Sequence, residues 1–374
     1  KYTVFKFFKH FNMSQQTHPG FHHRVSSAPD AKYKPAANRY VLYIGLSCPY
    51  AHRALISHAL KGLENVVQIV YTSTVFSIND VAKNTKGWVF GNPNHTLPPD
   101  QTFANILREF DAKSDEERAK VLAIDEMSQF YHNLDIRKTT TSCGVDTTDP
   151  IFNALSVKEI YNKVEPTYDG RFTVPFLFDK ETQSIVNNES IEICEIFDSA
   201  FDEFAANPSW TAFKTDSAEQ QQIIDAELLK VNSTLTVGVY MAGFATDQFK
   251  FYNATQMVAD YLNYIDTKLR SQRFLAGKKF SQVDICALVT LFRLNSVYIN
   301  LFHVSAKRVQ DFPNILAYMR DVWQNVFNEA ARKSWKERLA ATTSTFSLGT
   351  VPANAKLAPI DPVDFTVAVD RANL

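Results

Sequence analysis

The sequence has few cysteines, and their spacing limits the chemistry that they could share. Four occur in 374 residues, at Cys48, Cys143, Cys194 and Cys286, and no two have the C-x-x-C spacing of a redox or zinc motif. A disulfide framework and a metal centre are therefore poorly supported, and we predict no metal. This cysteine usage also indicates a reducing compartment, so we expect a cytoplasmic protein.

The sequence also lacks an excess of one charge. Lysine and arginine number 39 against 40 acidic residues, which gives a formal net charge of −1. This balance provides no general attraction for polyanions, so we predict no nucleic-acid partner. On inspection, no run approaches the roughly 18–20 apolar residues of a membrane-spanning helix, and we expect no membrane span.

The length and the order of patterns predict two domains. A chain of 374 residues exceeds the usual size of about 100–200 residues per domain. We divide it into an N-terminal arm (1–38), an α/β domain (39–205) with a long insertion near 74–150, a helical domain (206–341) and a C-terminal tail (342–374). The insertion has no function that we can assign, and Met13 is our expected natural start.

The residues around Cys48 predict a reactive thiol. Residues 39–46 have the β-branched and aromatic composition of a buried strand, and apolar residues recur at helical spacing over 51–59. Pro49 suits a first helical position, which puts Cys48 at the positive end of a helix dipole. We therefore expect a pKa for Cys48 below the roughly 8.5 of a free cysteine.

Cys48 has no partner thiol three residues later, because that position is Ala51. A resolving thiol must come from elsewhere, most simply from a small molecule such as glutathione. An isolated cysteine is more often a small buried hydrophobic residue. The Cys-Pro step between a strand and a helix favours catalysis instead.

The remaining patterns predict the fold class. A second strand over 66–71 completes a β-α-β unit, and strands over 172–178 and 184–186 form a hairpin before a helix from Ser190. We predict an α+β thioredoxin-like domain, followed by an all-α domain from about Pro208. There Ser281 and Asp284 form a capping-box pattern before the apolar residues 285–294 of a central buried helix.

Several ordered motifs resemble the Xi-class glutathione transferases, the glutathionyl-hydroquinone reductases, which are related to the Omega class. The matches run from about residue 39 to about residue 323. They comprise Cys-Pro-Tyr-Ala-His-Arg at 48–53, where the family has C-P-W-A-H-R, then residues 86–88, 170–175 with Asp179, 185–190, 238–240 with 243–245, and 297–298. The resemblance implies a glutathione transferase fold with glutathione as co-substrate, and a homodimer.

The resemblance also implies roles at the glutathione side of the site, each beside a structural alternative. Pro175, within a strand pattern, marks either an edge or a cis-proline that exposes the backbone of Val174 to glutathione. Glu189 and Ser190 open a helix. Either Ser190 is only its cap and Glu189 only complements the helix dipole, or they bind the γ-glutamyl carboxylate and ammonium respectively. The family assigns a tryptophan at Trp88 to cover glutathione, although a lone Trp is more often a packing residue. Lys158 and Arg171 are candidates for the glycine carboxylate.

On the acceptor side, Tyr240 and Tyr298 match tyrosines that face the electrophile, although a tyrosine in a helical domain is by default a core residue. The resemblance implies that Cys48 takes the glutathionyl group from a quinone-derived conjugate and passes it to a second glutathione. An Omega-like thioltransferase, a dehydroascorbate reductase and a non-catalytic scaffold are the alternatives. Tyr50, in place of the family tryptophan, alters the aromatic wall near the thiol.

The two ends of the chain carry weak signals. The terminal residues 371–374 distantly resemble the peroxisomal tripeptide S-K-L, so a peroxisomal location is the alternative to the cytoplasm. An ordinary disordered tail is the favoured interpretation. Phe5, Phe8 and Phe11 share a helical face, which leaves a membrane-surface helix as an alternative at the other end.

Overall fold

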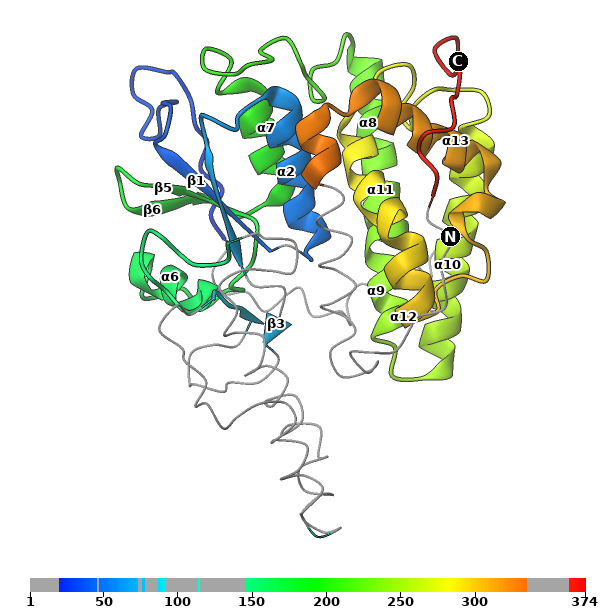
Figure 1. The fold of residues 1–374 in the computed structure, drawn as a ribbon, viewed down its shortest axis with the longest axis horizontal. Coiled ribbons are helices and arrows are strands. Elements are labelled where there is room, and N and C mark those ends of the chain that lie inside the picture. Colours follow the sequence, from blue (N-terminus) through cyan, green and yellow to red (C-terminus); the bar gives the residue numbers. More distant parts are fainter. Residues whose placement is uncertain are drawn as a thin grey trace.

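The structure is a computed structural model of the chain, and it describes residues 20–45, 47–72, 76–77, 87–91, 114, 146–334 and 363–374. Figure 1 shows a small sheet on one side and a set of long helices on the other, with α2 and α7 between them. The predicted start at Met13, Cys143 and nearly all of the predicted insertion lie outside the described residues.

A four-stranded sheet has the order β2-β1-β5-β6. Strand β1 (Tyr40–Gly45) pairs in parallel with β2 (Gln68–Thr72), and helix α2 (Pro49–Lys61) connects them. Strand β5 (Phe176–Asp179) pairs antiparallel with β1 and with β6 (Ser184–Asn187). All six residues of β1 are buried, as its apolar sequence predicts. The thioredoxin-like layout is therefore confirmed.

Two details differ from the sequence-based expectation. The strand predicted over 172–178 begins later, at Phe176, because Pro175 has no N–H to donate to the ladder. The prediction also missed helix α6 (Val157–Val164), which precedes β5 and is capped by the Ser156 side chain. Helix α7 (Ser190–Ser199) follows β6 as expected. A small second sheet pairs β3 (Phe76–Ser77) with β4 (Gly87–Trp88).

The part of the chain described after α7 contains helices and loops, as predicted for the second domain. Three runs are π-helical; one carries Tyr298 of the candidate site, and another directly precedes the helix that carries Tyr240. The helices are α8 (Ala218–Lys230), η1 (Val231–Thr236, π), α9 (Val237–Gly243), α10 (Gln248–Lys268), α11 (Gln282–Arg293), η2 (Leu294–Ile299, π), α12 (Asn300–Phe302), η3 (Val309–Asp311, 3-10), α13 (Pro313–Asp321) and η4 (Val322–Val326, π).

Helix α11 is the central helix, and all twelve of its residues are buried. The capping box is confirmed, since the Ser281 N–H donates to the Asp284 carboxylate at 2.8 Å. The same carboxylate accepts from the Leu275 N–H and the Tyr318 hydroxyl, each at 2.9 Å. One buried acid therefore joins the start of α11 to the preceding loop and to α13.

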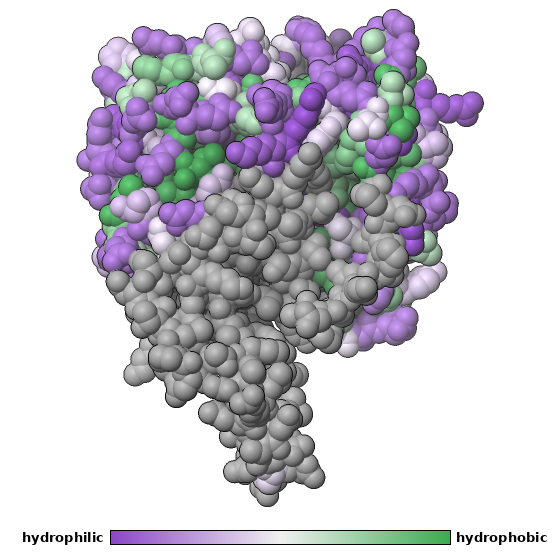
Figure 2. All heavy atoms as spheres, in the orientation of Figure 1, coloured by the Kyte–Doolittle hydropathy of each residue, from purple (hydrophilic) through white to green (hydrophobic). Residues whose placement is uncertain are grey.

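The expectation about apolar runs needs a correction at α11. The helical run Gln282–Phe302 is long and apolar enough to cross a membrane by length and composition. However, 78% of its apolar window is buried inside the protein, as in the core helix of a folded domain. The outer face shown in Figure 2 is mostly polar outside the grey region, with apolar residues in small separate groups.

Helix α2 contributes to two hydrophobic cores. Its residues Ala51, Ala54 and Leu55 pack in the core around the sheet. Its residues Ile56 and Leu60 pack in the core of the helical domain. Because twelve of its thirteen residues are buried, α2 is held on both sides, and its first turn lies where the two domains meet.

The end of α2 fastens the connection between the domains. The fully buried Lys61 ammonium donates to the backbone carbonyls of Asp198 at 2.7 Å, Pro208 at 2.9 Å and Trp210 at 3.0 Å. It also pairs with the Asp202 carboxylate at 2.5 Å. This lysine therefore satisfies carbonyl groups at the end of α7 and along the segment that leads to α8.

Both described ends of the chain pack against the folded domains. The N-terminal arm runs beside β6, where the His23 N–H donates to Val186 and the Asn188 N–H to Phe21, at 3.0 and 3.1 Å. At the other end, the Phe365 ring stacks on Trp323 with centroids 4.8 Å apart.

The last described residues are also fixed by hydrogen bonds. The buried Arg371 guanidinium donates to the carbonyls of Leu269 and Gln272, at 2.8 and 2.7 Å, just after α10. The prediction of a disordered tail is therefore wrong for the described last twelve residues. The carbonyl groups that follow α10 and the stacked rings of Phe365 and Trp323 therefore hold the tail in place.

We predict that His58 makes the fold sensitive to acid. Its Nε2 lies 2.9 Å from the Val67 carbonyl, and burial lowers its pKa to about 4. Between pH 6.5 and 4 the unfolded chain binds a proton that the folded chain does not, so the free energy of unfolding falls as the pH falls. Relative to His58→Gln, the native protein should lose about 3 kcal/mol of stability from pH 7 to pH 4.

Urea unfolding at both pH values measures this difference. The variant His303→Gln, at an exposed histidine, is the control and should follow the native protein. Equal losses of stability in the native protein and in His58→Gln would contradict the assignment to His58.

Candidate functional site

Cys48 is the N-cap residue of α2, as the sequence predicts. Its Sγ accepts a hydrogen bond from the Ala51 N–H at 3.5 Å, and Pro49 occupies the first turn, where an N–H is not needed. The side chain is 8% exposed. The thiol thus lies at the positive end of a helix whose position is fixed by two cores.

The backbone before β5 lies opposite the thiol. The Val174–Pro175 peptide is cis, which confirms the expectation for Pro175. The Val174 carbonyl oxygen is 3.5 Å from the Cys48 Sγ, which donates to it. Two segments that are 126 residues apart in the sequence therefore meet at the thiol.

The expectation of a lowered pKa for Cys48 is not met, because burial has the larger effect. Burial raises the pKa of the Cys48 thiol above its ordinary value. The N–H groups of Ala51 and Tyr50 and the positive charges of Arg293 and Arg53 act in the opposite direction and lower it. The sequence identifies the helix start but not how completely the thiol is removed from water.

Glu189 and Ser190 lie at the start of α7. Glu189 is the N-cap residue, and its carboxylate accepts from the Ile191 N–H at 3.5 Å and from the Ser190 hydroxyl at 3.3 Å. Ser190 is the first helical residue and is buried. The interpretation of Ser190 as the cap is therefore wrong. An exposed carboxylate beside the N–H groups of the first helical turn fits both ends of an amino acid.

Trp88 packs against the end of β1. A Cβ atom added to Gly45 would lie 2.5 Å from the Trp88 ring, so only glycine leaves room for the indole there. Gly87 and Trp88 form β4, and Lys86, the other residue of that motif, lies outside the described residues. The indole therefore packs on Gly45, the last residue of β1, which precedes Cys48 by three residues in the sequence.

The two basic candidates lie around α6 and β5. The Lys158 ammonium is 5.9 Å from the centre of the Phe172 ring. Arg171 is exposed, and its backbone carbonyl accepts from the Tyr168 hydroxyl at 3.0 Å. The hydrogen bonds of the Cys48 thiol among the described residues go to Val174 and Ala51, and the proposed role of Lys158 and Arg171 with a carboxylate stays a prediction.

The structure brings the two predicted tyrosines together. The Tyr240 and Tyr298 hydroxyl oxygens are 3.2 Å apart, and the rings meet edge to face with centroids 5.8 Å apart. Burial raises the pKa of Tyr298 to about 12, and raises that of Tyr240 well above its ordinary value. Negative charge at Cys48 adds to both shifts. Both phenols are therefore protonated at neutral pH and can donate.

The π-helical runs position this pair. Tyr298 lies within η2, and Tyr240 lies in α9, directly after η1. A π turn inserts an extra residue and changes the direction of the side chains that follow, and such turns are frequent at functional sites. Nothing in the apolar periodicity of the sequence indicates these interruptions.

Sequence reasoning missed Arg293, the last residue of α11. Its guanidinium is fully buried, with Nη1 at 3.1 Å from His52 Nδ1 and 2.8 Å from the Val289 carbonyl. The arginine directly follows an apolar run, which is the one signal that could have identified it. Arg293 supplies a positive charge from the helical domain to Cys48.

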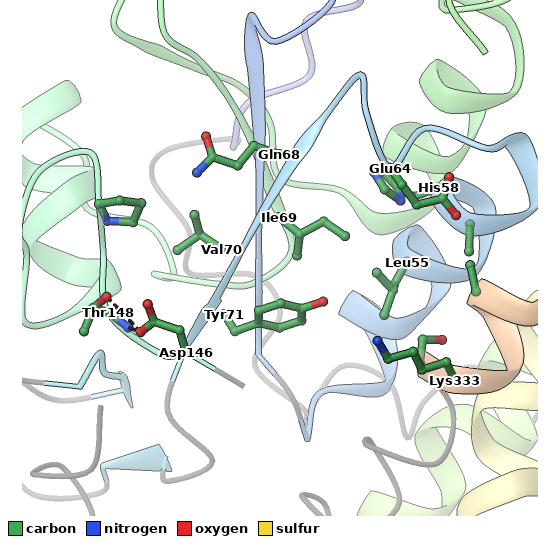
Figure 3. Close-up of a pocket in the computed structure, with 14 residues that line it drawn as sticks. Leu55, His58, Glu64, Gln68, Ile69, Val70, Tyr71, Asp146, Thr148 and Lys333 are labelled. Atoms are coloured by element: carbon green, nitrogen blue, oxygen red, sulfur yellow. Dashed lines mark hydrogen bonds between the residues drawn. The ribbon is translucent and has the colours of Figure 1, made fainter. Parts of the chain in front are cut away.

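A separate cavity of about 790 Å³ lies on the other side of α2. Figure 3 shows Leu55 and His58 of α2, Tyr71 of β2 and Lys333 around it, and none of the predicted site residues is among its lining. Among the described residues, no group of three His, Cys, Asp or Glu side chains could hold a metal ion.

Comparisons with known proteins agree with this geometry. The family described as Glutathione S-transferase, N-terminal domain, matches residues 47–200, and Glutathione S-transferase, C-terminal domain, matches residues 221–321. Glutathionyl-hydroquinone reductase PcpF of Sphingobium chlorophenolicum is 30% identical over 76% of this chain and 72% of its own. The solved Xi-class transferase of Natrialba magadii has a TM-score of 0.71 and 27% identity, covering 96% of this chain and 92% of that one.

The chain belongs to the Xi class of glutathione transferases. The Xi transferase ECM4 of Saccharomyces cerevisiae, solved in complex with glutathione, has a TM-score of 0.69 and 26% identity, covering 92% of this chain and 98% of that one. This Xi-class chain is therefore an enzyme with the two-domain glutathione transferase fold that the sequence predicts.

We predict that Gly45→Ala destabilises this transferase through Trp88. The added methyl group would overlap the indole, and overpacking of this kind costs about 1–3 kcal/mol. In a Trp88→Leu background the same substitution should cost less than about 0.5 kcal/mol, because the overlap is gone. Urea unfolding of the four proteins of this cycle measures the coupling. Equal costs in both backgrounds would show that Trp88 is not the obstacle.

Proposed function

We propose that this chain reduces glutathionyl-hydroquinones to hydroquinones through a mixed disulfide between Cys48 and glutathione. One observation carries the proposal. The Cys48 thiol, which caps the start of α2, interacts electrostatically with two buried phenols that can donate protons, Tyr240 and Tyr298. Relatives named glutathionyl-hydroquinone reductase, in Sphingobium chlorophenolicum and in Escherichia coli, support it.

In the first step the Cys48 thiolate attacks the sulfur of the glutathionyl-hydroquinone. A sulfur–sulfur bond forms and the bond between sulfur and the aromatic carbon breaks. The electron pair stays on the aromatic carbon, which takes up a proton and becomes the C–H of the hydroquinone. Tyr298 and Tyr240 donate hydrogen bonds to the hydroquinone oxygens and deliver the proton, which solvent then replaces.

In the second step a glutathione thiolate attacks the glutathionyl sulfur of the mixed disulfide. Glutathione disulfide leaves, and Cys48 returns as a thiolate. One conjugate and one glutathione are consumed, and one hydroquinone and one glutathione disulfide are formed. The aromatic carbon is reduced and the two glutathione sulfurs are oxidised, so the reaction needs no metal and no further reductant.

We assign the glutathione side of the site to two backbone segments and one tryptophan side chain. The Val174 backbone pairs with the peptide of glutathione beside the thiol, and the start of α7 takes its γ-glutamyl end. There the exposed Glu189 carboxylate receives the ammonium, while the N–H groups around Ser190 receive the carboxylate. Trp88 covers the bound peptide, and Lys158 and Arg171 are the nearest candidates for the glycine carboxylate.

The assembly and the location belong to the same proposal. We expect a homodimer, which light scattering of the purified protein would detect. We expect the cytoplasm rather than the peroxisome.

Cys48→Ser should abolish turnover. A serine hydroxyl stays protonated and cannot form the mixed disulfide, so reduction of a glutathionyl-hydroquinone should fall by roughly a thousandfold or more. Calorimetry should still detect glutathione binding to this variant. Mass spectrometry should show the single glutathione adduct in the native protein and none in the variant. The control Cys194→Ser, at a buried thiol in α7, should keep both activity and adduct. Reductase activity retained in Cys48→Ser would exclude the mechanism.

Tyr298→Phe should slow the reduction of one kind of substrate only. Without its hydroxyl, reduction of a glutathionyl-hydroquinone should slow by about a hundredfold, as for loss of a general acid. A simple glutathione mixed disulfide has no aromatic leaving group, so its reduction should stay within about threefold. Tyr318→Phe removes another buried hydroxyl, which bonds Asp284, and serves as the control. Equal slowing of both substrates would point to an Omega-like thioltransferase instead.

A further inference from the structure

Arg53 is a buried positive charge with neutral partners. Its side chain is 2% exposed, and one guanidinium nitrogen donates to Asn232 Oδ1 at 2.9 Å and to Thr236 Oγ1 at 3.4 Å. Its Nε has no hydrogen-bond partner. Among the residues that the structure describes, no aspartate or glutamate pairs with it. Burying a charge in this way is unfavourable unless an anion compensates it.

The guanidinium is held over an aromatic ring beside the thiol. The central carbon of Arg53 lies 4.8 Å from the centre of the Tyr50 ring, within the range of a cation–π contact. Tyr50 and Arg53 are three residues apart in α2, so they lie on the same face of the helix. Tyr50, the first residue of this face, is two residues after Cys48, so the charge and the ring lie near the start of α2.

The helical run formed by η1 and α9 presents one of its faces to Arg53. Asn232 and Thr236, the partners of Arg53, precede Tyr240 at intervals of four residues along η1 and α9. Residues at this spacing share a face of a helix. Arg53 therefore contacts the same helical face that carries one of the two phenols. Tyr50 lies in the first turn of α2, two residues after Cys48, and a negative charge on it would raise the pKa values of Tyr240 and Tyr298.

We propose that Arg53 and Tyr50 act together, Arg53 as the counter-ion of the Cys48 thiolate and Tyr50 as the wall against which the aromatic ring of the acceptor packs. The role of Tyr50 rests on the function proposed above, whereas that of Arg53 depends only on the thiol. Before attack, the negative charge is on the Cys48 sulfur, and Arg53 compensates it. When the mixed disulfide forms, the charge leaves with the aromatic carbon, and it returns to Cys48 with the release of glutathione disulfide.

Other charged and titratable groups face Cys48 and Tyr50, and each contributes to the electrostatic field there. They are Arg293 of α11, whose guanidinium also contacts His52, together with Tyr240 of α9, Tyr298 of η2 and Glu189 before α7. None of these is altered in the variants that test Arg53, so a change in the thiol can be assigned to Arg53.

Asn232→Asp provides the sharpest test. It places a carboxylate of nearly the same shape 2.9 Å from the guanidinium, which keeps Arg53 in position and neutralises its charge. The pH midpoint of Cys48 alkylation by iodoacetamide, read by mass spectrometry, should rise by about one unit. At pH 7 alkylation should then be about tenfold slower. Ser233→Asp, with the same charge on the next residue, should leave the midpoint unchanged.

Two substitutions of Arg53 complete the test. Arg53→Met removes the charge and should raise the midpoint as Asn232→Asp does, while Arg53→Lys keeps the charge and should stay within about threefold of the native rate. If Arg53→Met does not fold, Asn232→Asp decides. A native alkylation profile in folded Asn232→Asp would overturn the role of Arg53, because a purely structural arginine would only be stabilised by the new carboxylate.

Tyr50 is tested with the substrate. Tyr50→Leu should raise KM for a glutathionyl-hydroquinone about tenfold, and Tyr50→Phe should restore it because the ring is kept. Equal KM values in Tyr50→Leu and the native protein would overturn the role of Tyr50. Alkylation requires no reductase activity. If Cys48 of the native protein is alkylated as expected but the protein has no reductase activity, the proposed function is refuted. The role of Tyr50 is then refuted as well, and the role of Arg53 is unaffected.

Discussion

The burial of α2 between two hydrophobic cores is the constraint on which the rest of the structure depends. Its apolar residues face the sheet on one side and the helical domain on the other, and twelve of its thirteen residues are buried. The helix cannot tilt or slide without opening one of the two cores. Cys48 at its start and Lys61 at its end are therefore fixed relative to both domains, and the thiol faces groups from each of them.

The same burial creates the main electrostatic conflict of the site. Removing Cys48 from water raises the pKa of the thiol, whereas the helix N–H groups, Arg53 and Arg293 lower it. Burial also raises the pKa values of Tyr240 and Tyr298, which keeps both phenols as donors. Burial thus favours the proton donors and opposes the nucleophile. Arg53 and Arg293 offset it at the thiol, and Arg293 also offsets part of it at Tyr298.

Features decided by neighbouring residues were predictable from the sequence. The position of Cys48 before Pro49 follows from the chemistry of helix starts, and the capping box of Ser281 and Asp284 needs only residues three apart. The cis bond before Pro175 was predicted from the family resemblance, and the structure contains it. Helix α6 was missed although Val157, Ile160 and Tyr161 recur at helical spacing after the Ser156 cap. The contact of Trp88 with Gly45 joins segments that no local rule connects.

By itself, the sequence determined the order of the elements, the position of the thiol at a helix start and the family to which the chain belongs. These depend on local propensities and on short motifs, which survive without knowledge of the fold. Only the tertiary structure decided that burial outweighs the helix dipole at Cys48, that Arg53 and Arg293 are buried beside it, and that the tail is docked through Arg371. Burial and charge balance depend on which distant segments meet, and packing alone fixes that.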